Sequence, residues 1–573
     1  MAFTVLDRIV FTLTAGNIAY SLYQHFTKAP GLKIDKLLNE ARAASGTEAD
    51  VLLARVSEVC RQRIARNSRD AHALHQWGVA LWWRAAKATG AEADRLFEQA
   101  DQKFSAAQYI APNDAACCSD RVGALRYRAK VSPGEKARQL LRQTCELCRK
   151  RVGTVSNGPY DGRTFYAWGT ALWMLAMSEN GTEARRLYQE ADEKFTRGRT
   201  LAPEDAGIYV EQANALLHRA VLYSGDQRRE IVERARQQCQ QLASAGSGGA
   251  YVLVLWCSAL CGLGSMAKGA EPEAFFAEAE KKARRALEIA ADTPYAAAAV
   301  VRAMTCRALL ARGEARGRLL LDVCEEATRF DQAGPRDAEL LRLWGVALDW
   351  RAAAANRADA VRLFAEAEEK YSLALSAKPA DESISTYLGA SLSYHSKLLG
   401  SEAGRPLVLR SGELLDTVLK ASPGNCEALS RWADLLCWRV RFMDRDDATR
   451  MALDGVRRFE AAAEGGANPD SILRGWGIVL WTLAKLEEGE ESARRLLEAK
   501  AKFLESETRV PRSAAYDLAY VCSHMGGTEE CRHWLETSGE PGLAVSRNWL
   551  EADPEFAAVR ECEWFQRILA GQP

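Results

Sequence analysis

Tryptophan recurs along this chain at a nearly fixed interval. The spacings between six of its tryptophans are 91, 88, 88, 88 and 44 residues, so the underlying unit is about 44 residues long. These tryptophans are Trp77, Trp168, Trp256, Trp344, Trp432 and Trp476. A period of this length is the signature of a repeat array, in which each unit buries its apolar face against its neighbours. The 573 residues therefore do not form the roughly four separate domains that length alone suggests.

Units without the tryptophan fit between these positions. They are placed near Val122, Gln212, Val301 and Leu388, and a last one lies near Tyr520. The array then holds about eleven units.

Other residue types keep register with the tryptophan. Glycine follows it by 13 residues at Gly90, Gly181, Gly269 and Gly489, where we expect the first helix to stop, because glycine tolerates a positive φ. A small residue follows by 23, at Ala100, Ala191, Ala279, Ala367, Gly455 and Ala499. A mostly aromatic residue follows by 27, at Phe104, Phe195, Ala283, Tyr371, Phe459 and Phe503. Proline follows by 35, at Pro112, Pro203, Pro379 and Pro511. The pattern predicts a hairpin of two helices of about 18 residues, closed by proline.

The residues of the hairpin resemble the tetratricopeptide repeat family. The run Ala100, Phe104, Ala107 and Pro112 is similar to the second helix of that repeat, and Trp-Gly-x-Ala-Leu at Trp77 is similar to the first. The usual repeat has about 34 residues, so these hairpins are elongated, like those of the plant-type mitochondrial presequence receptor and of bacterial arrays. The resemblance implies an all-α fold, a right-handed α-solenoid whose concave side binds protein segments.

The repeat pattern also sets the expected domain boundaries. We expect the solenoid over residues 71–535, capping helices over 37–70 and a C-terminal cap over 536–573. Residues 1–36 contain the uncharged stretch 9–27, which precedes the basic residues Lys28, Lys33 and Lys36. This stretch reads as an amphipathic helix covering the first repeat, or alternatively as a weak membrane anchor.

A second set of tryptophans follows the first by five or six residues. It comprises Trp82, Trp83, Trp173, Trp350, Trp438 and Trp481. In tetratricopeptide proteins the corresponding turn contributes to the concave groove, so the resemblance implies an aromatic binding surface here. The alternative is that the lengthened helices need additional core. Trp83, which shares its unit with Trp82, is expected to be the most exposed.

Residues 119–151 contain ten basic residues against three acidic ones, a local net charge of +7 in a chain with no net charge. The basic cluster includes Arg121, Arg126, Arg128, Lys130, Arg142, Arg149, Lys150 and Arg151. It could receive an acidic protein, lipid headgroups or RNA, although a solvated helix face has the same composition.

Cysteine and histidine offer one weak metal candidate. Cys522 and His524 precede a glycine turn, and Cys531 and His533 follow it, but their spacing matches no common zinc site. No phosphate-binding loop or nucleophile motif is present, so neither a cofactor nor catalysis is expected. The 15 cysteines form no disulfide pattern, which favours an intracellular, cytoplasmic location, with association to an organelle membrane through residues 9–27 as the alternative.

The sequence therefore predicts a non-enzymatic protein-binding scaffold or adaptor that captures a peptide or helix along a concave groove. One alternative is a membrane-tethered receptor for targeting sequences, suggested by the resemblance to the presequence receptor. Another is an RNA-binding helical solenoid, although the zero net charge argues against a nucleic-acid partner.

Overall fold

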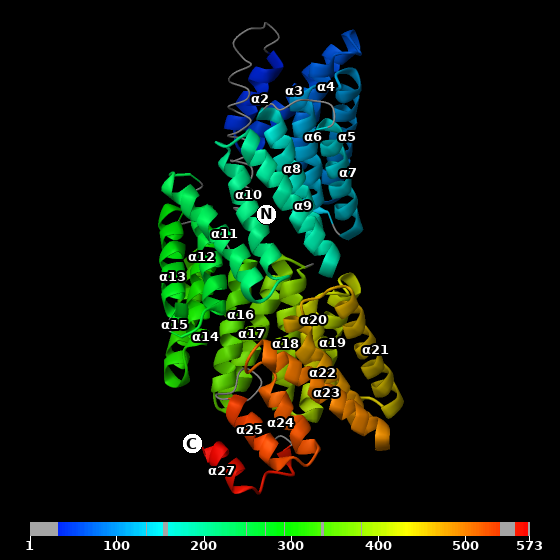
Figure 1. Ribbon diagram of the computed structural model, residues 1–573. Helices are drawn as coiled ribbons and strands as arrows, with labels where there is room; N and C mark the ends of the chain where they lie inside the picture. Colours follow the sequence, from blue (N-terminus) through cyan, green and yellow to red (C-terminus); the bar gives the residue numbers. More distant parts are fainter. Residues whose placement is uncertain are drawn as a thin grey trace. The chain divides into compact units, whose positions relative to one another are not determined.

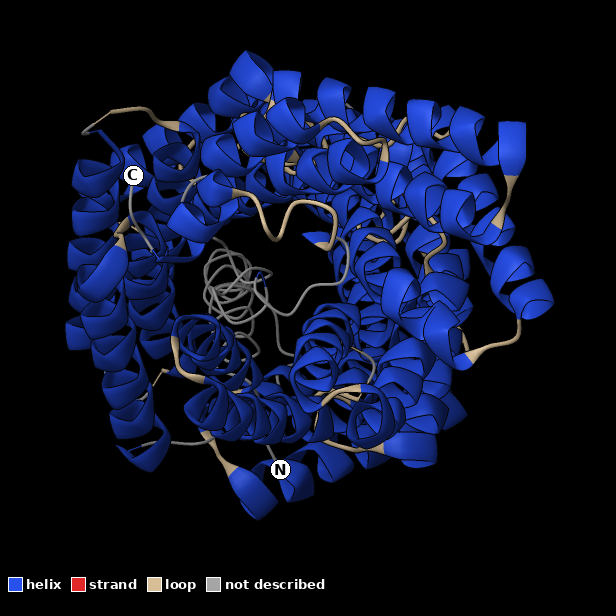
Figure 2. Cartoon of the chain, turned by 90° about the horizontal axis from the view of Figure 1, so that it is seen from below, coloured by secondary structure: helices blue, strands red, loops and turns tan. Residues whose placement is uncertain are grey.

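The computed structural model describes residues 33–132, 134–152, 159–247, 249–269, 271–290, 293–333, 337–379, 381–538, 550 and 556–570. Over these residues the regular structure consists of helices, and no strand is present (Figures 1 and 2). The predicted anchor at residues 9–27 lies outside the described residues, as does much of the predicted cap at 536–573.

The helices follow one another as pairs joined by short loops. The first helices of the pairs are α2 (Lys33–Ala43), α4 (Ala71–Ala85), α6 (Ala115–Val131), α8 (Pro159–Ala176), α10 (Ala206–Ala220), α12 (Gly249–Met266), α14 (Pro294–Leu310), α16 (Ala338–Ala354), α18 (Glu382–Leu399), α20 (Cys426–Arg439), α22 (Pro469–Leu486) and α24 (Ala515–His524). The second helices are α3 (Gly46–Arg66), α5 (Gly90–Ile110), α7 (Gly134–Val152), α9 (Gly181–Leu201), α11 (Gly225–Ser244), α13 (Glu271–Ile289), α15 (Gly313–Ala333), α17 (Arg357–Ala377), α19 (Ser401–Ala421), α21 (Arg445–Glu464), α23 (Gly489–Arg509) and α25 (Thr528–Ser538). A short 3₁₀ helix, η1 (Val440–Phe442), precedes α21, and α27 (Glu563–Ala570) lies near the C-terminus.

The prediction of an all-α solenoid is confirmed. The pairs from α4–α5 to α24–α25 cover the predicted repeat region, and α2–α3 adds one pair before it. The chain divides into two compact units: unit 1 comprises residues 1–178 and 183–216, and unit 2 comprises residues 179–182 and 217–573. Each unit is described by itself below.

The first helices begin at a capping residue that recurs with the repeat. Asp70 accepts a hydrogen bond from the backbone N–H of Ala73, and Asp381 accepts one from Ile384, so each satisfies a donor that has no partner inside its helix. The same role is played by Asp114, Asp337, Asn425 and Asn468.

The caps, together with the buried residues Cys148 and Ala327, which lie 27 positions after Arg121 and Val300, fix the register of two units without tryptophan. Asp114 lies seven residues before Arg121, as Asp70 lies seven before Trp77. By the same count from Thr293, the cap of α14, the equivalent residue is Val300. The predicted positions Val122 and Val301 are therefore each one residue late, which shifts them onto the place of the glycine after tryptophan.

The turn glycine begins the second helix and does not end the first, contrary to the expectation. Gly90 has a φ of +61° and is the first residue of α5. This conformation costs an L side chain about 1–2 kcal/mol, which explains why glycine recurs there. In α13, α19 and α25 the glycine lies one or two residues before the helix instead. Two second helices, α17 and α21, have no such glycine, and there Asn356 and Asp444 cap the helix with their side chains.

The glycine after tryptophan makes room for the aromatic residue 27 positions after the tryptophan. A Cβ atom built on Gly477 would lie 2.5 Å from the ring of Phe503, and one on Gly345 would lie 2.6 Å from the ring of Tyr371. Where the residue one after the tryptophan position is larger than glycine, the residue 27 after it is smaller than an aromatic one, as with Val301 and the fully buried Ala327. Each hairpin is thus closed by a pair of residues with complementary volumes.

A lysine or arginine side chain lies over the ring of each of the six repeated tryptophans, a contact that the sequence pattern did not predict. The ammonium group of Lys282 lies 3.7 Å from the ring centroid of Trp256, within the range of a cation–π interaction. The equivalent contacts join Lys103 to Trp77, Lys194 to Trp168, Lys370 to Trp344, Arg458 to Trp432 and Lys502 to Trp476. Units without the tryptophan have Leu147, Gln238, Glu326 or Leu414 at the place of this cation. The paired change of both residues indicates a structural role for these tryptophans.

The first helices form the inner layer of unit 2. From α12 to α22 each first helix packs against the next first helix as well as against its own partner, whereas the second helices of neighbouring units make no comparable contact in this described part of the chain. The array therefore curves toward the first helices, which line its concave side.

Candidate functional site

A continuous row of polar side chains runs across the inner layer of unit 2. From α12 to α22 it lies on one stripe of each first helix, at positions five, two or one before and two or six after the tryptophan position, as the helical period requires. We call this row the inner ladder. It consists of Ser258, Arg302, Glu339, Arg342, Tyr387, Tyr394, Arg431, Asp434, Arg474 and Asp517.

The ladder begins at α12. The guanidinium of Arg302 on α14 donates to Oγ of Ser258 at 3.0 Å and to the carboxylate of Glu339 on α16 at 2.8 Å. Arg342 donates to the same carboxylate at 2.7 Å. Burial alone would raise the pKa of Glu339, but the hydrogen bonds and charges of the two arginines lower it to about 2. Glu339 is therefore ionised and binds α14 to α16 at any physiological pH.

The ladder continues through aromatic residues on α18 to the end of the array. The guanidinium of Arg342 lies 4.9 Å from the ring centroid of Tyr387, and Arg431 on α20 donates to the hydroxyl of Tyr394 at 3.4 Å.

Arg474 on α22 forms the last step. It lies 3.0 Å from Asp434 on α20 and 2.7 Å from Asp517 on α24. The side chains of Asp434 and Asp517 are only 11% and 10% exposed, whereas that of Arg474 is 28% exposed. Each first helix from α12 to α24 is thus joined to the next by a polar contact or by an arginine over an aromatic ring.

Unit 1 carries a comparable set of contacts. Nε2 of His75 on α4 lies 2.8 Å from Oδ2 of Asp120 on α6. Burial alone would lower the pKa of His75, but the hydrogen bond to Asp120 and the charges of Asp120 and Asp114 raise it. Arg126 on α6 lies over the ring of Tyr166 on α8, 5.1 Å from its centroid.

Sequence reasoning missed the inner ladder because its partners lie about one repeat apart. One feature of the sequence could have indicated the inner ladder: a polar residue recurs two positions before the tryptophan, at His75, Tyr166, Arg342 and Arg474. The inner ladder consists mainly of ion pairs, with hydroxyl groups between them. These polar side chains form a prearranged hydrophilic surface. Their hydrogen bonds and ion pairs with each other can be replaced by hydrogen bonds and ion pairs with a partner.

The second tryptophans lie between helices and do not form one surface. Trp83 is only 6% exposed and has the guanidinium of Arg42 4.7 Å from its ring centroid, so the prediction that it is exposed is wrong. Trp82 is buried against α6, and Trp481 is buried and stacks on Tyr520 of α24 with a centroid distance of 5.5 Å. The remaining three, Trp173, Trp350 and Trp438, are half-buried. The lengthened helices use these rings largely as packing between neighbouring units.

The basic cluster is balanced by acids that lie earlier in the sequence. Arg121 lies 2.7 Å from Asp101, Arg128 lies 2.8 Å from Glu98, and Lys136 lies 2.8 Å from Asp94. These three carboxylates of α5 lower the local net charge from +7 to +4. Four other members bind nearby acceptors: Arg142 binds Glu135, Arg149 and Lys150 bind Glu146, and Arg151 binds the carbonyl of Asn113. These pairs favour the solvated helix face over a binding surface for this cluster.

The metal candidate is also corrected. Cys522 and Cys531 are buried in the core, whereas His524 and His533 are exposed, so the four side chains do not converge. Over the described residues no group of three or more potential ligands could hold a metal ion.

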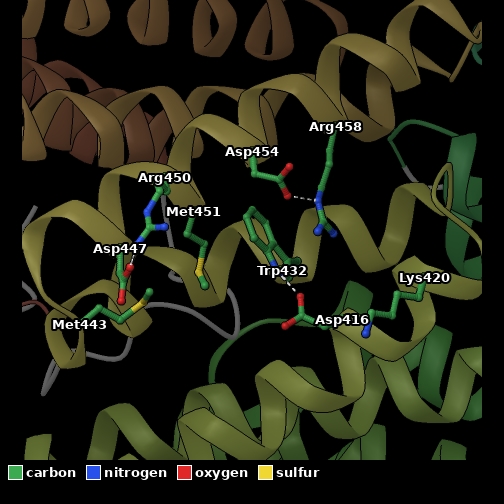
Figure 3. Close-up of a pocket in the computed structure, with 9 residues that line it drawn as sticks. All are labelled: Asp416, Lys420, Trp432, Met443, Asp447, Arg450, Met451, Asp454 and Arg458. Carbon is green, nitrogen blue, oxygen red and sulfur yellow. Dashed lines mark hydrogen bonds and ion pairs between the residues drawn. The ribbon is translucent and has the colours of Figure 1, made fainter.

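A separate pocket lies on the side of the second helices. Its volume is about 460 Å³, and it opens between α19, α20 and α21 (Figure 3). Trp432 and two methionines form its apolar part, and its charged residues pair within the pocket: Arg458 with Asp454, and Arg450 with Asp447. Asp416 accepts a hydrogen bond from Nε1 of Trp432 at 2.9 Å. The pocket carries as many acids as bases and has no evident preference for a charged ligand.

Asp349 is a buried carboxyl group on α16 whose protonation state can be tested. The hydroxyls of Tyr371 and Ser391 donate to its carboxylate at 2.8 and 2.7 Å, and burial raises its pKa to about 7. Because the folded pKa exceeds the unfolded value of about 3.9, Asp349 stabilises the folded state at low pH, and this contribution is lost as the pH rises from about 4 through 7.

We expect Asp349→Asn to remove this pH dependence. Relative to the wild type, the variant should gain stability between pH 5 and pH 8, on the order of a few kcal/mol. Urea denaturation at both pH values measures the difference. An equal difference at the two values would show that Asp349 is ionised throughout.

One helix of the described residues is apolar and long enough to cross a membrane. It is α12, and 67% of its apolar stretch is buried inside the structure, which is also usual for a core helix.

Comparison with known proteins gives distant structural likenesses. No protein-family model matches the chain, and no curated protein matches it. Among solved structures, the human IFIT1 dimer with PPP-AAAA is 13% identical with a TM-score of 0.40, covering 85% of this chain and 93% of its own. The APC/C hetero-tetramer Cut9–Hcn1 is 10% identical with a TM-score of 0.35, covering 97% and 98%. Scores at this level carry no argument about this chain, whose fold class rests on its own repeated helices.

Proposed function

We propose that this protein is a non-enzymatic scaffold that binds a segment of a protein partner along the inner face of unit 2. The inner ladder carries the proposal. It places charged and tyrosine side chains on successive first helices, on the concave side where helical solenoids bind their partners. Its arginines keep part of their surface accessible, as shown by the 28% exposure of Arg474.

The character of this face differs from the tryptophan-lined groove that the sequence suggested. Its accessible groups are guanidinium, carboxylate and hydroxyl groups, so a partner would be recognised by hydrogen bonds and charge more than by apolar anchors. Binding of this kind favours specificity and fast association, which suits an adaptor.

Site-specific photo-crosslinking tests the proposal. A photoreactive residue at Ser258 or Val346 lies on the inner stripe, whereas one at Leu409 or Leu497 lies on an exposed part of a second helix. We expect discrete crosslinked protein adducts from the inner positions in cells that express the chain, and none from the outer positions. Adducts formed only from the outer positions would contradict the proposal.

A further inference from the structure

Three basic residues occupy equivalent places in three consecutive units of unit 2. Lys397, Arg441 and Lys485 are separated by 44 residues each and lie nine residues after the tryptophan position. Lys397 and Lys485 lie in the last turns of α18 and α22, and Arg441 lies in η1 directly after α20; the helices α18, α20 and α22 lie side by side (Figure 1). We call these three residues the basic edge. At the corresponding place the earlier units of unit 2 have Val221, Ser265, Leu309 and Ala353, so the positive charge is confined to this part.

The cations of the basic edge are each positioned by an aromatic ring. Lys397 lies 5.6 Å from the ring centroid of Tyr394, Arg441 lies 4.8 Å from that of Trp438, and Lys485 lies 4.6 Å from that of Trp481. Such contacts limit the freedom of long basic side chains, which lowers the entropy lost on binding. Arg441 and Lys485 are exposed and Lys397 is half-exposed, so a partner can reach all three.

The three charges also act on one buried group. Burial raises the pKa of the Cys437 thiol, and Lys397, Lys485 and Arg441 each oppose that rise, although they come from three different units. Cys437 lies on α20, the middle of the three helices. The three cations therefore lie within electrostatic reach of one residue of α20, beside the carboxylate of Asp434.

We infer that the basic edge binds an acidic, extended segment of the protein partner, and this inference rests on the proposed function. Neighbouring helices lie about 9 Å apart. An extended chain in the polyproline II conformation rises about 3.1 Å per residue with three residues per turn, so every third side chain lies on the same side. Carboxylates about three residues apart would then meet successive cations. A helical segment, which rises about 1.5 Å per residue, would need carboxylates about six residues apart.

The residues of the inner ladder beside the basic edge favour an acidic peptide over a nucleic acid as its ligand. Asp434 lies beside the basic edge, and Asp517 follows it on α24, so acids border the cations on the inner face. A phosphate backbone carries charge at every nucleotide, whereas a peptide can place neutral residues between its carboxylates and so match cations that lie on separate helices.

Fluorescence anisotropy with synthetic probes tests this inference on the full-length chain. The probe is a labelled 12-residue peptide with glutamate at every third position and glycine or serine elsewhere. Its controls are the same peptide with glutamine, a peptide with glutamate at every sixth position, and a labelled oligoadenylate RNA. We expect the first probe to bind tightest, and its binding to weaken as salt is added.

Charge-removing variants identify the surface. Lys397→Gln, Arg441→Gln and Lys485→Gln combined should weaken binding by about tenfold or more. The matched control combines Arg362→Gln, Arg457→Gln and Arg494→Gln, which removes three exposed charges from second helices. Equal losses in both variants, or tighter binding of the glutamine peptide, the sixth-position peptide or the RNA, would overturn the inference. Inner-face crosslinks that persist in the basic-edge variant would leave the proposed function standing while the acidic partner class fails.

Discussion

Gly477→Val should destabilise the protein by about 3 kcal/mol. A glycine inside a helix is normally less stable than other residues, so a substitution in open space would be neutral or favourable. At Gly477 the sign reverses because a Cβ atom would lie 2.5 and 2.7 Å from ring atoms of Phe503, which is buried and cannot move aside. The free energy of unfolding, measured by urea denaturation, gives the size of the effect.

A second substitution in the same hairpin tests whether the loss of stability comes from the clash with Phe503. Phe503→Ala alone should cost about 3–5 kcal/mol, because it leaves a cavity in a closely packed core. The double variant would have valine opposite alanine, as Val301 and Ala327 already have in another unit. We therefore expect it to lose clearly less than the sum of the two single losses.

Gly317→Val is the matched control. Gly317 lies inside α15, and no atom lies within 4 Å of its built Cβ. Its replacement should change the free energy of unfolding by no more than about 0.5 kcal/mol. Additive losses at Gly477 and Phe503 would show that the two positions do not share one volume.

The sequence predicted the features of the fold that recur within each unit. The small residues at Ala100 and its equivalents and the aromatic residues at Phe104 and its equivalents lie where the period placed them, and both are buried. This succeeded because a solenoid repeats the same local contacts, so a core position in one unit identifies the others. The role of glycine after tryptophan became clear only from the distance between Gly477 and Phe503, since the two lie 26 residues apart.

The inner face could not be predicted in the same way. Arg474 meets Asp517 and Arg302 meets Glu339, so each pair joins different units and different repeat positions. The charge balance of the basic cluster could not be predicted for a related reason. A window along the chain counts charges on two helices but omits the carboxylates of the preceding helix, such as Asp101, that pack against them. The exposure of Trp83 was wrongly predicted because Arg42, whose guanidinium lies over its ring, comes before the first tryptophan of the repeat.

Arg474→Met should cost about 3 kcal/mol, because it leaves Asp434 and Asp517 facing each other with little water around them. The lost attraction between charges is the smaller part of this cost, since a buried pair gains little over apolar residues of the same size. Most of it is the uncompensated burial of two carboxylates, so Asp434→Asn and Asp517→Asn added to Arg474→Met should recover much of the stability. Arg494→Met, which removes an exposed arginine paired with Glu491, should change stability by less than about 1 kcal/mol. Thermal and urea unfolding of the four proteins measure these differences. If Arg474→Met were as mild as Arg494→Met, water would already solvate the two carboxylates, and the inner ladder would not be holding α20, α22 and α24 together.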